Sequence, residues 1–206
     1  EASAGCAAVR GAALGAVEFS ADGAAAGVRC ADGTLLAAPR VVVGAERAPA
    51  GGAAPAYHVV RLYAVLAHAP QMCKDARSCR LLVPASQCGR KHGIHLSSSC
   101  HGAHRVAPDG AWLAVFSTRV EGPTDGLAPL EVAKRELAAA LPILRPTRKV
   151  FAEVSAVYTA DADATLPEGL HVLPSVDETT SLDEVVDDVE VAYEAVAGKP
   201  LELAGV

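Results

Sequence analysis

The sequence is poor in aromatic residues and has no excess of positive charge. Aromatics make up 4% of the 206 residues, and the formal net charge is −6. A protein without a basic surface is a poor ligand for nucleic acid, which we exclude as a partner. No uninterrupted apolar run approaches the roughly 20 residues that cross a bilayer, so we expect no stable membrane insertion.

The start of the chain lacks two further features. Residues 1–10 do not have the basic and then apolar profile of a secretory signal peptide. There is no initial methionine, because the only methionine of the chain is Met72. We therefore expect a cytoplasmic protein, and we expect the chain to be part of a longer polypeptide.

Cysteine is too sparse for a disulfide framework. Six cysteines are spread over 206 residues, and no two of them have the C-x-x-C spacing. This pattern favours reduced thiols in a cytosolic protein. None of Cys73, Cys79 or Cys88 lies in a context that would activate a nucleophile, such as the N-terminus of a helix.

Four cysteines and four histidines nevertheless gather between Met72 and Arg105, which suggests a zinc site. Metal ligands must converge on one point, with bonds of roughly 2.0–2.3 Å. On an extended strand His95 and His101 would share a face but lie about 20 Å apart, at roughly 3.3 Å per residue. We therefore predict no metal site, and zinc remains a weaker alternative that requires His101 to meet His104 across a turn.

The motifs of common catalytic and cofactor sites are also missing. The sequence has no G-x-S-x-G elbow and no P-loop, and the glycines at 11–15 do not have the G-x-G-x-x-G spacing. The pair Asp161 and Asp163 is typical of an exposed acidic loop. We predict no catalytic, cofactor-binding or metal-binding residues, and no enzymatic activity.

Turn signals divide the first part of the chain into short strands. Asp22-Gly23 and Asp32-Gly33 each lie between apolar stretches, which is a strong signal for a β-hairpin. The flanking predicted strands are 15–20, 24–30 and 34–37. Residues 40–44 follow as an apolar run with three valines, which favours a strand that is buried on both faces.

A second group of strands follows a loop of Ala, Pro and Gly at 48–56. Alternation of residue types predicts strands at 57–68, 80–83, 93–99 and 112–120. The connections between them are short, and one contains Asp109-Gly110. Four such strands in succession indicate an antiparallel β-meander.

The period then changes to that of a helix. Pro129 is well suited to a first helical position, and Pro142 would end the helix. Between them, apolar residues recur at helical spacing at Leu130, Ala133, Leu137 and Leu141.

The last part of the chain predicts strands at 149–158 and 170–173 and then a final helix. Ser181-Leu182-Asp183-Glu184 has the pattern of a capping box, which marks the start of that helix. Gly198 is placed to end it. Its outer face is acidic, which is typical of a solvated helix surface.

Several segments of the predicted meander match a known family. The strand at 58–70 leads into the turn Asp75-Ala76-Arg77-Ser78-Cys79, and Arg90-Lys91 precedes the next strand. Further matches are at 110–118, at 120–121 and at the helix end 193–198. With these residues the chain resembles the Rab GDP-dissociation inhibitors from about residue 27 to residue 199. It resembles the related Rab escort proteins less closely.

The resemblance implies a mixed α/β (α+β) fold, namely the C-terminal part of a large domain that is similar to flavin monooxygenases but has no catalysis. Residues 1–47 would then form the strand-rich part of a layer similar to FAD/NAD(P)-binding folds. Residues 57–158 would form an antiparallel sheet subdomain with one helix. Residues 166–206 would supply a terminal strand and helix that return to the first layer.

The resemblance also implies a function and a contact site. The family binds prenylated, GDP-bound Rab GTPases, slows GDP release and extracts Rab proteins from membranes. Its Rab-binding platform ends in Gly-Gly-Thr-Tyr-Met, and the Thr and Met that contact Rab align here with Ala7 and Val9. Both replacements remove contact atoms, so we expect weak Rab-binding residues at these two positions. The alternative is a fragment of a flavin-dependent oxidoreductase, because the layout of sheets and helices is the same.

Overall fold

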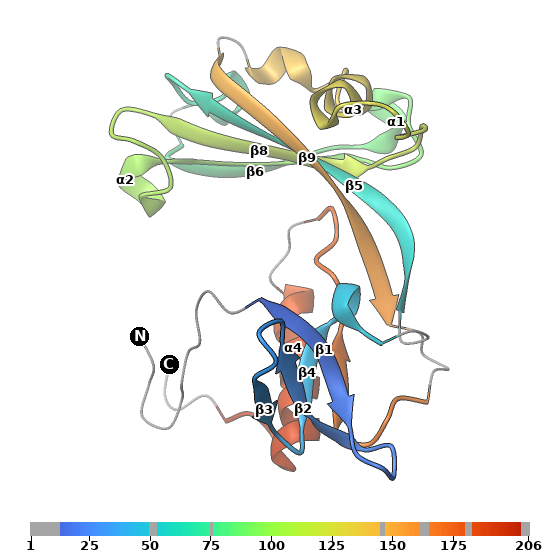
Figure 1. The fold of residues 1–206 in the computed structure, drawn as a ribbon. Helices are drawn as coiled ribbons and strands as arrows, with labels where there is room; N and C mark the ends of the chain where they lie inside the picture. Colours follow the sequence, from blue (N-terminus) through green and yellow to red (C-terminus); the bar gives the residue numbers. More distant parts are fainter. Residues whose placement is uncertain are drawn as a thin grey trace. The chain divides into compact units, whose positions relative to one another are not determined.

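The chain divides into two compact units (Figure 1). The computed structural model describes residues 13–49, 53–74, 76–144, 147–160, 165–179 and 183–202. Unit 1 comprises Glu1–Ala54, Tyr158–Ser175 and Leu182–Val206, and unit 2 comprises Pro55–Val157 and Val176–Ser181. Both units combine sheets with helices, as the predicted mixed α/β (α+β) fold requires.

Unit 1 begins with three short antiparallel strands. These are β1 (Leu14–Phe19), β2 (Ala25–Cys30) and β3 (Leu35–Ala37), paired in that order. The turns between them contain Gly23 and Gly33, whose φ angles of 87° and 88° are accessible to glycine without steric cost. The two Asp-Gly hairpins predicted from the sequence are therefore confirmed.

A parallel pair of strands forms the second layer of unit 1. Strand β4 (Val41–Gly44) pairs with β10 (Leu170–Leu173), which follows it by more than a hundred residues in the chain. Val41 is buried with Ala25 and Leu170, but Val42 is 46% exposed. The prediction that this strand is buried on both faces was therefore wrong. Only the face that carries Val41 is closely packed, whereas Val42 on the other face lines an apolar pocket with Val189 and Tyr193.

A short 3₁₀ helix, η1 (Ala45–Arg47), follows β4, and helix α4 (Asp183–Ala197) packs against β10 near the end of the chain. The chain leaves α4 at Gly198, whose φ is 71°, and this confirms the predicted helix end. The predicted capping residue Ser181 lies outside the described residues. Within the described ranges, no helix is both long enough and apolar enough to span a membrane.

Unit 2 is built on one five-stranded sheet. Its strands are β5 (Ala53–Leu66), β6 (Ser78–Val83), β7 (Ile94–Cys100), β8 (Trp112–Arg119) and β9 (Thr147–Ala160). Their order across the sheet is β6-β7-β8-β5-β9. Strands β6, β7 and β8 form a meander, but β5 lies beside β8 and not beside β6. The predicted four-strand meander is therefore corrected to a Greek-key order, in which the first strand closes against the fourth.

Short helices connect the strands of unit 2. These are η2 (Gln71–Cys73), α1 (Ala85–Cys88), α2 (His101–His104), α3 (Pro129–Glu136) and η3 (Leu141–Leu144). Pro129 occupies the first position of α3, as the sequence predicts. The predicted helix is longer than α3, because the backbone leaves α-helical geometry at Leu137 and continues into η3.

The core of unit 2 lies between α3 and one face of the sheet. Buried residues from β5, β7, β8 and α3 form a single cluster, which includes Leu62, Leu66, Leu96, Phe116 and Val132. Successive residues of a strand point to opposite faces, so Arg61 and Tyr63 of β5 lie on the other face. That second face carries the polar groups described below.

The backbone of Gly169 lies very close to the backbone of Pro39, so a substitution at Gly169 tests the packing in unit 1. Its φ is +79°, and a Cβ atom there would lie 2.3 Å from the carbonyl oxygen of Pro39. Gly23 has a similar φ of +87°, but nothing lies within 4 Å of its Cβ position. We expect Gly169→Ala to lower the free energy of unfolding of unit 1 by about 2 kcal/mol more than Gly23→Ala. Equal losses for the two variants in urea unfolding would contradict the close contact.

Candidate functional site

The two predicted Rab-binding residues, Ala7 and Val9, lie outside the described residues. The described part of the chain instead has two polar clusters and a disulfide-bonded turn in unit 2, and an apolar groove in unit 1.

The outer face of the five-stranded sheet holds residues 176–179, which we call the strap. Arg61 of β5 donates hydrogen bonds to the carbonyl oxygens of Val176 at 3.2 Å and Asp177 at 2.7 Å. Ser117 Oγ of β8 donates to the Glu178 carbonyl at 2.5 Å, and Arg80 of β6 donates to the carbonyl of residue 179. Four successive carbonyls of the strap are therefore satisfied by side chains of the sheet.

Glu178 is the buried carboxylate of the strap, with 6% of its surface exposed. Its Oε1 accepts a hydrogen bond from Arg119 Nε at 2.6 Å. The Arg119 guanidinium lies over the Tyr57 ring, 3.8 Å from the ring centre, in a cation–π contact. Burial and the nearby Glu178 carboxylate raise the pKa of Tyr57 to about 12, so its hydroxyl stays protonated at neutral pH.

His95 lies on the same side of the sheet as Arg80 and Ser117. Burial lowers the pKa of His95 below its ordinary value, although the charge of Glu178 opposes this effect. The imidazole is therefore neutral at physiological pH. Arg119 of this face is paired with Glu178, and Arg61 and Arg80 donate to carbonyl oxygens of the strap. This arrangement suits binding and positioning better than proton transfer.

A second polar cluster surrounds Glu136, the last residue of α3, which is 3% exposed. Its carboxylate accepts hydrogen bonds from Arg90 Nη1, from Arg135 Nε at 2.9 Å and from Arg135 Nη2 at 2.7 Å. The amide N–H groups of Gly122 and Glu121 donate to it at 3.1 Å and 3.3 Å. We call Arg90, Glu121, Arg135 and Glu136 the Glu136 cluster.

Arg90 connects this cluster to the sheet. Its Nη2 donates to the carbonyl oxygen of Arg119 at 2.7 Å and lies 3.5 Å from Glu121 Oε1. The neighbouring Lys91 takes part through its amide N–H, which donates to Glu121 Oε1 at 2.9 Å. Arg90-Lys91, singled out in the sequence for its resemblance, therefore fixes the junction between α3 and the ends of β7 and β8.

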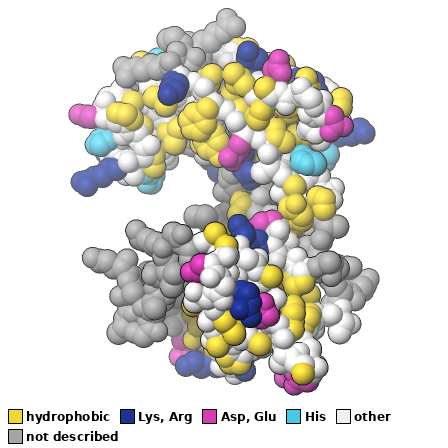
Figure 2. All heavy atoms as spheres, in the orientation of Figure 1, with side chains coloured by type: hydrophobic (Ala, Val, Ile, Leu, Met, Phe, Trp, Pro, Cys, Tyr) yellow, Lys and Arg dark blue, Asp and Glu magenta, His cyan; other side chains and the backbone are white. Residues whose placement is uncertain are grey.

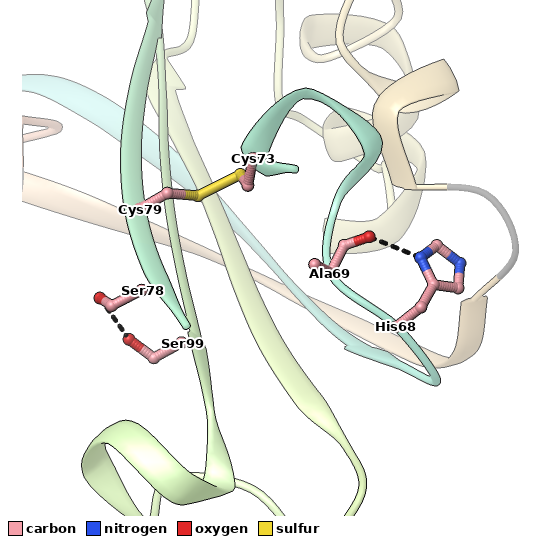
Figure 3. The surroundings of a disulfide bond; sticks show 6 residues. All are labelled: His68, Ala69, Cys73, Ser78, Cys79 and Ser99. Carbon is pink, nitrogen blue, oxygen red and sulfur yellow. Dashed lines mark hydrogen bonds between the residues drawn. A yellow bond between two sulfur atoms is a disulfide. The ribbon is translucent and has the colours of Figure 1, made fainter. Parts of the chain in front are cut away.

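The turn between β5 and β6 carries a disulfide between Cys73 and Cys79, whose Cα atoms are 6.2 Å apart (Figure 3). The prediction of reduced thiols was therefore wrong for these two residues. Their sequence spacing of six gave no warning, because η2 folds the chain back and brings Cys73 to the start of β6. Beside the disulfide, the hydroxyls of Ser78 and Ser99 are 3.0 Å apart and hydrogen-bonded.

The histidines between 92 and 104 do not all lie on one extended strand, although the distance between His95 and His101 was predicted for such a strand. Strand β7 ends at Cys100, so His101 and His104 lie on the single helical turn α2. His101 Nδ1 lies 2.8 Å from the carbonyl oxygen of Ala107. Among the described residues, no group of three or more His, Cys, Asp or Glu side chains is placed to hold a metal ion.

Unit 1 has an apolar groove of about 330 Å³ between its antiparallel strands and β4. Apolar side chains are visible at the surface of the molecule in Figure 2. Of those that line the groove, Leu14 is 51% exposed and Leu36 is 40% exposed. Among the described residues that line it, the charged ones are Arg40 and Arg47. The described lining therefore contains no acid, base or nucleophile.

Sequence reasoning missed the strap and the buried carboxylates Glu136 and Glu178. A signal existed for Glu136. It lies three residues after Ala133, so on a helix its side chain would be on the apolar side. A second signal was Arg61 in a largely apolar strand, because a partly buried cation needs a partner. Nothing in the sequence around Glu178 indicated that the strap would lie on this sheet.

The comparisons with known proteins agree with one another. The family model "GDP dissociation inhibitor" matches residues 5–206. Rab GDP dissociation inhibitor beta of Rattus norvegicus is 26% identical over 144 residues, which are 70% of this chain and 30% of that protein. Rab GDP-dissociation inhibitor of Pyricularia oryzae is 29% identical over 148 residues, which are 72% of this chain and 30% of that protein. The chain thus spans about 30% of the length of these curated relatives.

Solved structures share the fold. The Rab GDI of Plasmodium falciparum superposes with a TM-score of 0.76 at 20% identity, over 93% of this chain and 42% of that one. The halogenase PltM superposes with a TM-score of 0.55 at 9% identity, over 89% of this chain and 41% of that one. These likenesses show the fold alone, whereas the family match covers nearly the whole sequence. The chain belongs to the GDP dissociation inhibitor family.

Proposed function

We propose that this chain is the C-terminal part of the large domain of a Rab GDP-dissociation inhibitor. The whole protein binds prenylated, GDP-bound Rab GTPases, slows GDP release and supports their extraction from membranes during vesicle transport in the cytoplasm. The observation that carries this proposal is the family match over residues 5–206, together with relatives named as Rab inhibitors.

The proposed protein is a binding regulator and not an enzyme. The described clusters support this, because their carboxylates and guanidinium groups are paired with one another and face no nucleophile. The groove of unit 1 is lined by apolar residues and two arginines. Neither arrangement resembles a nucleophile held by a base.

A flavin-dependent oxidoreductase is the second candidate, because the halogenase PltM has a related fold. The sequence lacks the glycine spacing that lets a backbone approach a dinucleotide pyrophosphate. The phosphate-cradling loop of such an enzyme is therefore either absent or outside this chain. A flavin absorption spectrum from the purified full-length protein would overturn the regulator proposal.

We propose that Ala7 and Val9 border the Rab contact and make it weak. The resemblance places a threonine and a methionine at these positions, and the replacements remove a hydroxyl and a long apolar side chain. We expect the double substitution Ala7→Thr with Val9→Met to strengthen Rab binding about tenfold, for one added hydrogen bond and added apolar contact. The dissociation constant of full-length protein and prenylated Rab measures this, with Ala8→Thr as the control. An unchanged constant would remove these two residues from the contact.

Selectivity for the nucleotide state tests the proposed function itself. A GDP-dissociation inhibitor must bind the GDP form of its GTPase more tightly than the GTP form. Full-length protein is titrated into prenylated Rab loaded with GDP or with a non-hydrolysable GTP analogue. Tighter binding of the GDP form is expected, and equal binding of both forms would count against the proposal.

A further inference from the structure

The turn that joins β5 to β6 holds two cysteines at bonding distance. Cys73 and Cys79 are disulfide-bonded, and Cys73 is 7% exposed. We propose that this pair is a reversible redox site whose co-reactant is a small disulfide of the glutathione type. The proposal is independent of the proposed Rab function, because it rests only on the chemistry of this turn.

Backbone hydrogen bonds help the disulfide to hold both cysteines in place. Cys73 N donates to the carbonyl oxygen of Pro70 at 2.8 Å, and Ala76 N donates to the carbonyl of Cys73 at 3.0 Å. Cys79 is fixed by the β6–β7 ladder, where it faces Ser98. The Cα separation of 6.2 Å lies within the range of about 4.4–6.8 Å that disulfides need. The two thiols are therefore already positioned to form the bond.

The three free cysteines of the described ranges lie in other surroundings. Cys30 is buried, and the Cys88 thiol donates to the carbonyl oxygens of Pro84 and Ala85 at 3.3 Å and 3.5 Å. Burial raises the pKa of the Cys100 thiol, but hydrogen bonds from the Ala103 amide and the Arg77 guanidinium outweigh this effect and lower the pKa. Cys100 is, however, not bonded to another of the described cysteines. We therefore assign the redox chemistry to Cys73 and Cys79.

The turn is also open to an anionic reagent. Lys74, the neighbour of Cys73, is exposed, whereas Arg77 donates to the carbonyl oxygen of Gly102 and Arg80 donates to that of residue 179. A cationic neighbour favours the thiolate form of a cysteine, which is the nucleophile in exchange. The positive charge of Lys74 also attracts glutathione disulfide, which carries net negative charge. Cys79 is the more exposed of the two cysteines and is the one that reacts first.

The exchange balances in two steps. The Cys79 thiolate attacks one sulfur of the small disulfide, a mixed disulfide forms and one small thiolate leaves. The Cys73 thiolate then attacks the Cys79 sulfur, the protein disulfide forms and the second small thiolate leaves. The protein loses two electrons and two protons, and the co-reactant takes them up as two thiols.

The bond would control the order of the turn. It joins η2 to the edge strand β6, and the ring of residues 73–79 includes Lys74, which has a φ of 50°. A non-glycine residue in this region persists only where its surroundings hold it. Reduction releases that constraint, so the backbone around Met72 and Lys74 becomes more mobile.

Mass spectrometry of the full-length protein in glutathione buffers tests the site. After alkylation in oxidised glutathione, a Cys73–Cys79 linked peptide is expected, and it should disappear in reduced glutathione. Hydrogen exchange at the Cys73 and Ala76 amides should become about tenfold faster on reduction. Cys88→Ser should change nothing, and Cys73→Ser should trap glutathione on Cys79. Free alkylation of both cysteines in oxidised buffer, glutathione addition at Cys100 alone, or a linked peptide that resists reduced glutathione would each overturn the proposal.

Discussion

Replacing Glu136 by alanine is expected to lower the free energy of unfolding of unit 2 by about 3–5 kcal/mol. The carboxylate is 3% exposed and accepts hydrogen bonds from two arginines and two backbone amides. Its removal leaves Arg90, whose side chain is only 12% exposed, without its main counter-ion. An uncompensated buried charge costs far more than a lost surface pair.

Urea unfolding of the full-length protein, followed by hydrogen exchange at the backbone amides of unit 2, measures this loss. Lys134→Ala is the matched control, because Lys134 lies on the same helix and is exposed. It should change the stability by no more than about 0.5 kcal/mol. A loss below about 1 kcal/mol for Glu136→Ala would show that the cluster does not hold α3 on the sheet.

The same carboxylate makes stability depend on pH. Burial alone would raise the pKa of Glu136, but hydrogen bonds from Arg90 and Arg135 outweigh it and hold this pKa below its ordinary value. Its contribution is therefore complete above the unfolded pKa of about 4.3 and is lost as the pH falls through the folded pKa. Below about pH 4.3, the native protein should lose stability more steeply than Glu136→Gln.

Replacing Glu178 by alanine is expected to cost about 3 kcal/mol and to release the strap. Glu178 is 6% exposed and pairs with Arg119, which is 34% exposed and retains part of its solvation. The loss is therefore at the lower end of the range for buried pairs. The backbone carbonyls of the strap would keep their donors but lose the side chain that anchors them to the sheet.

Cleavage of the strap by a protease separates an anchoring role from a general loss of stability. Limited proteolysis should cut Glu178→Ala within residues 176–179 under conditions that leave the native protein intact. Glu168→Ala, at a residue outside the Glu178 pair, serves as the control and should behave like the native protein. If the strap of Glu178→Ala stays resistant to protease, then its carbonyl hydrogen bonds hold it without the ion pair.

Local patterns predicted most strands and helices of this fold because they depend on neighbouring residues alone. The Asp-Gly turns set the β1–β2 and β2–β3 hairpins, and the apolar residues after Pro129 set α3. The order of the strands in the sheet was harder to predict, because β5 and β8 pair across more than forty intervening residues. Alternation within a strand shows which residues share a face but not which strand lies beside it.

The polar sites could not be derived in this way. The strap reaches Arg61 across more than a hundred residues of sequence, and η2 alone brings Cys73 to Cys79. Spacing along the chain does not show where such distant partners meet. The resemblance identified the family, and the family match over residues 5–206 shows it. The weak Rab contacts of Ala7 and Val9 remain predictions.

The rate of GDP release from a prenylated Rab tests the central claim most directly. Rab loaded with labelled GDP is mixed with excess unlabelled nucleotide, with and without the full-length protein that contains this chain. We expect the protein to slow release strongly, and the effect to saturate with protein concentration. Release at the same rate with and without the protein would contradict it.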